Sequence, residues 1–231
     1  MSFYGYETVS SSQIHQLQNR IAELERRERQ RQNGNGLTPD NHWDILRCHP
    51  KIWLDQLMVK KEGEICGGGE QDWRTVLAKQ PIPRRGIFYF EVKILCTGDF
   101  NRCRIAIGLA TEQMPLNEMV GTYNGTYAYG TGLFDCANFW GHAGNRRFMA
   151  GDLPSFSAGD VVGCGVNLDT RQIIYTKNGQ RLDTSGLFVR TVCNLFPCVS
   201  LPFRHAEIVA YFGPNFKYNL ANELAYDYDS D

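Results

Sequence analysis

The residues of this chain best suited to chemistry are its cysteines and histidines, because a thiolate–imidazole pair can act as a nucleophile and both side chains bind metals. The 8 cysteines and 5 histidines contain no C-x-x-C pair and no spacing that forms a metal-binding face. Cys48 and His49 are neighbours, but adjacent side chains of an extended segment point to opposite faces. The pattern predicts no metal, no cofactor and no catalysis, with a Cys-dependent enzyme as a distant alternative.

Two glycine-rich segments are similar in composition to phosphate-binding loops but lack the neighbouring residues that such loops require. Residues 67–69 are three glycines that are not followed by the Lys-Ser/Thr pair of a P-loop. Gly163 and Gly165 lie inside an apolar alternation and lack the third glycine and the following helix of a dinucleotide-binding motif. We interpret Gly163 and Gly165 as sites of close packing within a sheet.

The composition argues against a nucleic-acid-binding protein and against a membrane-spanning protein. A formal net charge of -1 gives no reason to expect nucleic acid as a partner, and no apolar stretch is long enough to cross a bilayer. The 13 Phe, 11 Tyr and 4 Trp suffice for one packed domain. We expect the cysteines to be reduced and mostly buried. Since the N-terminus does not resemble a signal peptide, we expect a cytosolic protein or one whose signal has been removed.

The elements that must position any site are strands. The clearest pattern lies in residues 158–182, where four apolar residues alternate with small or polar ones: Val162, Cys164, Val166 and Leu168. Residues 171–176 then run back, and Asn178-Gly179 suits the positive φ angles of a tight hairpin turn. Similar short strands with turn signals recur across residues 41–220 and predict an all-β fold, an antiparallel β-sandwich.

The two ends of the chain differ from this pattern. Within residues 1–40, four apolar residues recur at helical spacing: Ile14, Leu17, Ile21 and Leu24. As the a and d positions of a short coiled coil they predict a weak parallel homodimer; the alternative is a charged helix in a monomer. Residues 33–36 fit a linker. Residues 221–231 are predicted to form an acidic tail.

Several segments resemble those of SPRY domains in the expected order: residues 86–94, 107–111, 160–168, 175–179, 195–201 and 212–213. The similarity covers residues 41–220 and implies a SPRY sandwich of the concanavalin-like jelly-roll type. Four further segments are most similar to Ran-binding-protein-M-like SPRY proteins, and among these to the secreted SPRY effectors of plant-parasitic cyst nematodes: residues 113–116, 125–129, 139–143 and 213–216.

The resemblance implies a non-enzymatic module that binds a partner protein or peptide through loops at one end of the sandwich. Effectors of this kind are injected into host plant cells, and some modulate host immune receptors, which makes such a receptor the expected partner. The protein would then act in the host cytoplasm. The alternative is an endogenous cytosolic scaffold or adaptor of the Ran-binding-protein-M type.

The resemblance also assigns a binding pocket, residue by residue. In SPRY domains that bind short peptides, three loops form the pocket. The early loops correspond here to Gly68, Glu70 and Asp72. The loop after the Gly-Leu-Ala-Thr strand corresponds to Tyr123, and the connection before the last strand corresponds to Phe203 and Arg204. Phe203 stands where related ligase adaptors have Trp and would form an aromatic floor. Arg204 would pair with a carboxylate or a backbone carbonyl.

Other residues in predicted loops join the expected partner-binding set: Asp99, Phe100, Arg102, Asn124, Arg146 and Arg147. Together with Arg204, the arginines would form a basic rim that selects an acidic partner surface; the alternative is a set of unrelated, solvated side chains. For the aromatic residues of the neighbouring strands we expect core packing: Trp73, Tyr127, Tyr129, Phe139 and Trp140.

Overall fold

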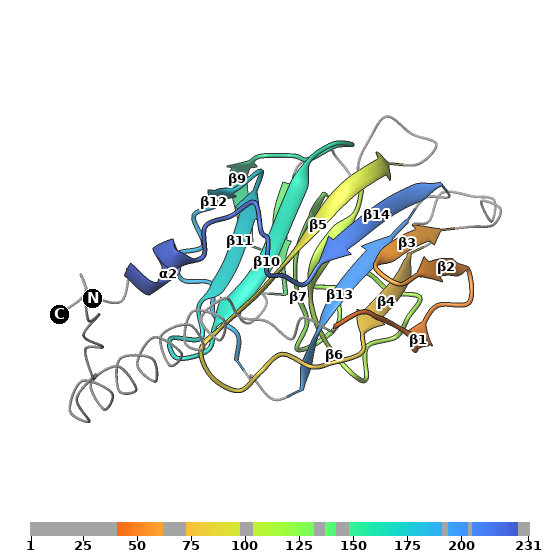
Figure 1. Cartoon of the computed structure of the whole chain (residues 1–231), viewed down its shortest axis with the longest axis horizontal. Helices are drawn as coiled ribbons and strands as arrows, with labels where there is room; N and C mark the ends of the chain where they lie inside the picture. The colour runs from red at the N-terminus through yellow and green to blue at the C-terminus, as the bar shows by residue number, and fades with distance from the viewer. Residues whose placement is uncertain are drawn as a thin grey trace, which may run out of the picture.

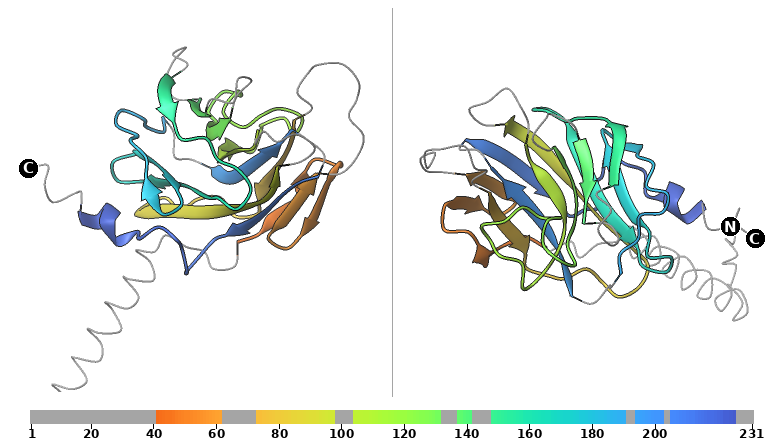
Figure 2. Two further views of the ribbon diagram at one scale, coloured as in Figure 1. Left: turned by 90° about the horizontal axis from the view of Figure 1, so that it is seen from above. Right: turned by 180° about the vertical axis from the view of Figure 1, so that it is seen from behind.

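The protein folds into two antiparallel β-sheets that pack face to face, as the sequence predicts (Figure 1). This computed structural model describes residues 41–61, 73–97, 104–131, 137–141, 148–190, 194–202 and 205–225. The left view of Figure 2 shows the two layers from the edge. The segment with the predicted helical stripe, residues 1–40, lies outside the described residues.

Sheet A contains seven strands in the order β1-β4-β13-β6-β7-β8-β9. Their bounds are β1 Trp43–Cys48, β4 Arg74–Ala78, β13 Leu195–Leu201, β6 Ala106–Thr111, β7 Tyr127–Thr131, β8 Ala137–Trp140 and β9 Phe148–Leu153. Sheet B also contains seven strands, in the order β12-β11-β10-β5-β14-β3-β2. Their bounds are β12 Gln180–Arg181, β11 Ile173–Lys177, β10 Val161–Asn167, β5 Ile87–Thr97, β14 Ala206–Tyr211, β3 Met58–Lys61 and β2 Ile52–Asp55.

The hairpin predicted within residues 158–182 is present. β10 pairs antiparallel with β11, with Val162 opposite Lys177 and Val166 opposite Ile173. Asn178 and Gly179 then adopt φ values of 53° and 82°. Because both angles are positive, the chain turns tightly into β12, as the Asn-Gly pair predicts.

The main core lies between the sheets, where alternate strand residues face inward. β5 contributes Phe88, Phe90, Val92 and Ile94, each at most 1% exposed. Burying a side chain of this size stabilises the fold by about 2 kcal/mol. Four of the five aromatic residues expected in the core are buried there or in the smaller cluster on sheet A: Trp73, Tyr127, Tyr129 and Phe139. Trp140 is only half-buried.

Both outer faces carry a covering segment. On sheet A, residues 112–126 connect β6 to β7 and enclose a second apolar cluster with Trp73, Leu77 and Phe196. On sheet B, residues 213–225, here the C-terminal strap, pack Tyr218 and Leu220 on the outer face. The strap ends in the helix α2, Ala221–Ala225. Residues 221–225, placed in the tail by the sequence pattern, therefore form part of the packed structure.

The glycine pair of β10 has the packing role that the sequence suggests. A side chain at Gly163 would overlap the hydroxyl groups of Tyr89 and Thr176. At Gly165 it would overlap the backbone oxygen of Phe88. Both glycines therefore allow β5 and its outward-facing Tyr89 to lie directly against β10.

Candidate functional site

Six strands start or stop together at one end of the sandwich, here called the loop end. On sheet A, β13 ends at Leu201 opposite Arg74, the first residue of β4. On sheet B, Ala206 at the start of β14 lies opposite Thr97 at the end of β5. Lys61, at the end of β3, ties the two sheets together, because its Nζ donates a hydrogen bond of 2.6 Å to the Pro202 carbonyl. β6 begins at the same end, since its Ala106 lies opposite Ser200.

Most of the predicted partner-binding residues belong to the three connections that leave this end. The β3–β4 connection contains Gly68, Glu70 and Asp72, the β5–β6 connection contains Asp99, Phe100 and Arg102, and the β13–β14 connection contains Phe203 and Arg204. These residues lie outside the described part of the chain. The described strands on either side of them begin and end side by side.

Two other predicted groups belong to connections that leave the opposite end. β6 ends at Thr111, opposite Leu195 at the start of β13, and the next connection contains Tyr123 and Asn124. β8 ends at Trp140, opposite Ala128 near the start of β7. Arg146 and Arg147 lie in the β8–β9 connection, outside the described residues. The strand ends therefore divide the predicted site residues into two groups.

The β6–β7 connection partly bridges this division, because it folds back along sheet A toward the loop end. Leu116 O accepts a hydrogen bond of 2.9 Å from Thr75 N, and Glu118 O accepts one of 2.6 Å from Thr75 Oγ1. Val120 N donates to Ser200 Oγ at 2.9 Å. Thr75 and Ser200 each lie one residue from a strand end at the loop end. The connection is thereby anchored along the face of the sheet.

Tyr123 is held in a tight turn within this connection. Its carbonyl accepts hydrogen bonds from Thr126 N at 3.2 Å and from Thr126 Oγ1 at 2.7 Å. Gly121 N in turn donates to Thr126 Oγ1 at 2.8 Å. The Tyr123 side chain is half-buried against the second apolar cluster, as is Trp140, whereas Asn124 is exposed. This corner presents an ordered, partly apolar surface of the kind that anchors a protein contact.

Positive charge gathers at the loop end around His49, which follows β1 and donates from its backbone N to Thr75 O at 3.0 Å. Burial and the nearby charges of Arg74, Lys51 and Lys61 lower the pKa of His49 to about 4. The imidazole is therefore neutral at physiological pH, and its Nδ1 accepts a hydrogen bond of 3.1 Å from Lys51 N. A local potential of this sign favours acidic groups on a ligand.

Three of the four described thiols are not activated. Burial, and then the charge of Asp44, raises the pKa of Cys48 to about 12. Burial also raises the pKa values of Cys164 and Cys198 well above the ordinary thiol value. These three thiols are therefore protonated at neutral pH, and a protonated thiol is a poor nucleophile. Within the described ranges, no group of three or more His, Cys, Asp or Glu residues is arranged to hold a metal.

One exposed feature escaped the sequence patterns, an outward bulge of the edge strand β1. Ile45 and Leu46 are 70% and 88% exposed, because the pairing with β4 is irregular between Trp43 and Cys48. The bulge is clamped by Arg47, whose Nε donates to Asp44 Oδ2 at 2.9 Å and whose NH2 donates to Lys79 O at 2.7 Å. The sequence pattern does not indicate the bulge, because the second half of the clamp is the Lys79 carbonyl, which is distant in sequence.

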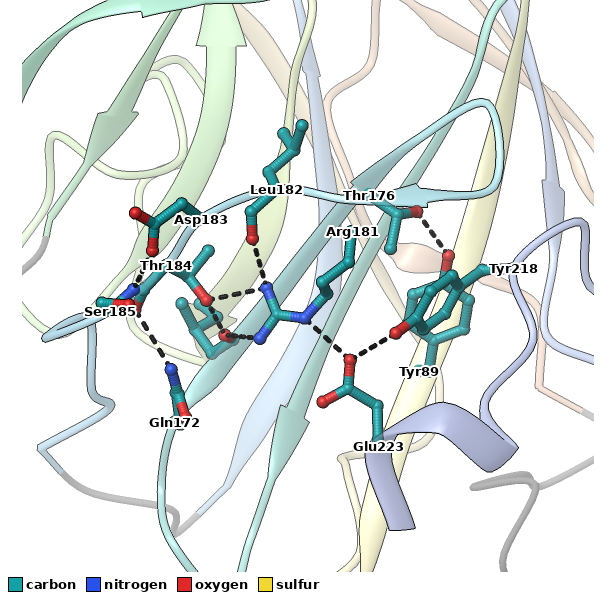
Figure 3. Close-up of polar contacts among 11 residues, drawn as sticks. Tyr89, Gln172, Thr176, Arg181, Leu182, Asp183, Thr184, Ser185, Tyr218 and Glu223 are labelled. Carbon is teal, nitrogen blue, oxygen red and sulfur yellow. Dashed lines mark hydrogen bonds and ion pairs between the residues drawn. The ribbon is translucent and has the colours of Figure 1, made fainter. Parts of the chain in front are cut away.

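A second feature that sequence reasoning missed is the anchor of the C-terminal strap (Figure 3). Glu223 Oε1 accepts hydrogen bonds from Arg181 Nε at 2.7 Å and from the Tyr218 hydroxyl at 2.6 Å. The Arg181 guanidinium also donates to Thr184 Oγ1 at 2.7 Å. Nearby, Glu91 accepts from the backbone N of Tyr218 at 2.9 Å. These contacts hold the strap on sheet B and serve the fold.

No helix in the described part of the chain has the length and apolar character needed to span a membrane.

Comparison with known proteins finds a family model, sequence relatives and a solved structure that are similar to this chain. The SPRY domain model matches residues 87–215. The Ran-binding proteins 9/10 homolog of Drosophila melanogaster is 34% identical over 170 residues, which cover 73% of this chain and 17% of that protein. Ran-binding protein 9 of Homo sapiens is 34% identical over 165 residues, 70% of this chain and 21% of that protein. The chain thus spans about a fifth of the length of these relatives.

Among solved structures, the crystal structure of a human SPRY domain superposes with a TM-score of 0.55 at 24% sequence identity. The match covers 72% of this chain and 98% of that one. It shows that the two chains share a fold.

Proposed function

Because the chain belongs to the SPRY domain family, whose members are protein-interaction modules, we propose that it captures a partner protein or peptide through the connections at its loop end and catalyses no reaction. The observation that carries this proposal is the strand register. β3, β5 and β13 end where β4, β6 and β14 begin, so the connections between them leave the sandwich from neighbouring points. Binding residues concentrate on such connections when a rigid sheet holds their ends.

Within this site, Phe203 supplies an apolar anchor and Arg204 pairs with a carboxylate or a backbone carbonyl of the ligand. The ligand carries an acidic group that pairs with Arg204. Tyr123 adds a second contact at the corner of sheet A.

For the biological setting, we propose delivery into a host plant cell, where the protein binds an immune receptor in the cytoplasm. The basis is the resemblance of four segments to secreted nematode effectors: residues 113–116, 125–129, 139–143 and 213–216. The second candidate is a cytosolic scaffold in the organism's own cells. It is favoured by the 34% identity to the Drosophila Ran-binding protein homolog over 170 residues.

The test is a pull-down from host-plant lysate and from lysate of the source organism, with folding checked by circular dichroism. We expect the double variant Tyr123→Ala, Phe203→Ala to lose the partner that the wild type retains. Phe188→Ala is the matched control, because Phe188 is an aromatic side chain 46% exposed in a different connection. Undiminished capture by the folded double variant would show that the binding surface lies elsewhere.

The single variants separate the two groups of residues. If Phe203→Ala alone abolishes capture and Tyr123→Ala has no effect, the site is confined to the loop end. The lysate that yields the partner distinguishes the two settings. A partner retained only from host lysate supports the effector, and one retained only from the organism's own lysate supports the scaffold.

A further inference from the structure

The end of the sandwich opposite the loop end, here called the far end, carries three connections that backbone hydrogen bonds hold side by side. They are residues 79–86 between β4 and β5, residues 168–172 between β10 and β11, and residues 182–190 after β12. Leu168 N donates to Gly86 O at 2.9 Å, and Val189 N donates to Arg171 O at 2.9 Å. The three connections therefore form one continuous surface.

Each connection carries at least one exposed arginine, and these four residues are here called the far-end arginines: Arg84, Arg85, Arg171 and Arg190. Within the described part of the chain, none of their guanidinium groups makes a hydrogen bond or an ion pair. Arg181, by contrast, is paired with Glu223 at 2.7 Å. The guanidinium groups of the far-end arginines can therefore all pair with a ligand.

The carboxylates of these connections do not neutralise the arginines. Lys79 and the far-end arginines outnumber the two acidic residues of the same three connections, Asp169 and Asp183. Asp183 Oδ1 already accepts a hydrogen bond of 2.9 Å from the backbone N of Ser185. Asp169 is exposed and forms no ion pair with a described residue. The three connections are therefore net positive, although the whole chain has a formal net charge of -1.

Arg171 is held in a backbone conformation that its residue type disfavours. Its φ is 64°, an angle that Gly and Asn adopt with less strain. The turn imposes this angle, because Asn167 Oδ1 accepts hydrogen bonds from Asp169 N at 3.0 Å and Thr170 N at 3.2 Å, and Asn167 N donates to Gln172 O at 2.9 Å. The turn itself does not require an arginine. A strained backbone angle beneath an exposed, unpaired cation points to a function of that side chain.

The chemistry of the far-end arginines selects a carboxylate ligand. A guanidinium group pairs with a carboxylate through two parallel hydrogen bonds, and arginine is enriched at protein interfaces. Nucleic-acid-binding domains are usually basic as a whole, which this chain is not. We infer that the far end is a protein-binding surface that takes a short acidic segment of a partner, with the far-end arginines paired to its Asp or Glu side chains. The fixed turn at Arg171 lowers the entropy cost of this contact.

This surface is separate from the loop end and does not depend on the proposed function. β5 runs between the two ends, and its 11 residues span about 35 Å. A ligand at the far end therefore leaves the loop end accessible, so that one domain can hold two partners at once.

The test is a titration of the full chain into fluorescein-labelled hexaglutamate, read by fluorescence anisotropy at low ionic strength. We expect the double variant Arg171→Asn, Arg190→Gln to bind the peptide about tenfold more weakly than the wild type, because two exposed ion pairs are lost. Lys93→Gln, Lys217→Gln is the matched control, since it removes the same charge from two exposed side chains on sheet B and should bind like the wild type.

A second measurement separates binding from folding. Because Asn accepts the φ of residue 171 more easily than Arg, Arg171→Asn should lower peptide affinity while leaving the denaturation midpoint unchanged or raised. A merely structural role for Arg171 predicts a lower midpoint instead. Arg204→Gln reports on the loop end and should not change the affinity for hexaglutamate.

Three results would overturn the inference. If the far-end double variant and the lysine control weaken binding equally, the peptide senses only the net charge of the domain. If Arg204→Gln abolishes binding and the far-end double variant does not, the peptide binds at the loop end. If a thymidine hexanucleotide binds the far-end arginines more tightly than hexaglutamate does, the surface takes nucleic acid and not an acidic protein segment.

Discussion

The hydroxyl of Tyr89 occupies the volume in which a side chain at Gly163 would begin. That hydroxyl bonds to Thr176 Oγ1 at 2.6 Å and donates to Glu91 Oε1 at 3.0 Å. Glu91 in turn accepts from the backbone N of Lys217 at 2.8 Å. The absence of a side chain in the middle of β10 thus permits the polar contacts that fix the strap to sheet B.

Gly163→Ala should therefore destabilise the fold although the residue lies in an ordinary strand. The added methyl group displaces the Tyr89 hydroxyl and disrupts its bonds, for an expected loss of about 2–3 kcal/mol in the free energy of unfolding. Chemical denaturation measures it. Gly186→Ala is the comparison, because Gly186 has a φ of 79° and open space around it, so it reports backbone strain alone. A Gly163→Ala loss no larger than that of a surface substitution would contradict the packing argument.

Glu223→Gln should loosen the C-terminal strap. Glu223 is 7% exposed, and the substitution leaves the Arg181 guanidinium without its carboxylate partner. We expect a loss of about 1–3 kcal/mol. Faster amide hydrogen exchange should be confined to residues 213–225. Glu112→Gln is the control, because the Glu112 side chain is 60% exposed and its ion pair with Arg47 measures 3.9 Å. Exchange that rises uniformly over the domain would argue against a local role.

His49 should make stability depend on pH in the mildly acidic range. Its pKa is about 4 in the folded protein, against the ordinary histidine value of 6.5. Between these values the unfolded chain binds more protons, so folding stability falls as the pH drops from about 6.5 to 4 and is unaffected above that range. His49→Gln should remove this component. The measurement is the unfolding midpoint of the wild type and of the variant at several pH values. A difference between the two midpoints that does not change with pH would contradict the predicted contribution of His49.

The two Asn-Gly pairs in the described part of the chain, Asn124-Gly125 and Asn178-Gly179, should deamidate at different rates. Deamidation requires the Asn side chain to rotate so that the next backbone nitrogen attacks its Cγ and releases ammonia. Asn178 is held, since its Nδ2 donates to Asp160 Oδ1 at 2.7 Å and its Oδ1 accepts from Val161 N at 2.9 Å. Asn124 is exposed. After incubation in mildly alkaline buffer, peptide mapping should find more conversion at Asn124 than at Asn178, and equal conversion would count against this difference in constraint.

The sequence predicts the fold well where the responsible forces are local. The alternation of Val162 to Val166 and the Asn178-Gly179 pair predict a hairpin because a strand's period and a turn's φ angles are properties of neighbouring residues. The close packing at Gly163 and the burial of Tyr127 and Tyr129 follow from the same patterns. The bulge at Ile45 and Leu46 does not, because its clamp uses the Lys79 carbonyl, which becomes a neighbour only in the folded chain.

The candidate site could be predicted only in outline. Residue patterns identify connections, but they do not say from which end of a sandwich each connection leaves. Phe203 follows β13 and Tyr123 follows β6, and these adjacent strands are antiparallel, so the two connections start at opposite ends. The folding back of residues 116–120 depends on hydrogen bonds to Thr75 and Ser200, which lie far away in the sequence.

The shared ends of β3, β5 and β13 have a consequence for how such a protein can diverge. The three connections at the loop end begin after paired strands whose inward residues already form the core. If these connections bind the partner as proposed, changes in their length or composition alter partner choice at little expense in stability. On that proposal, the residues that determine specificity are separate from the residues that form the core, so the connections can change in sequence while the core stays constant.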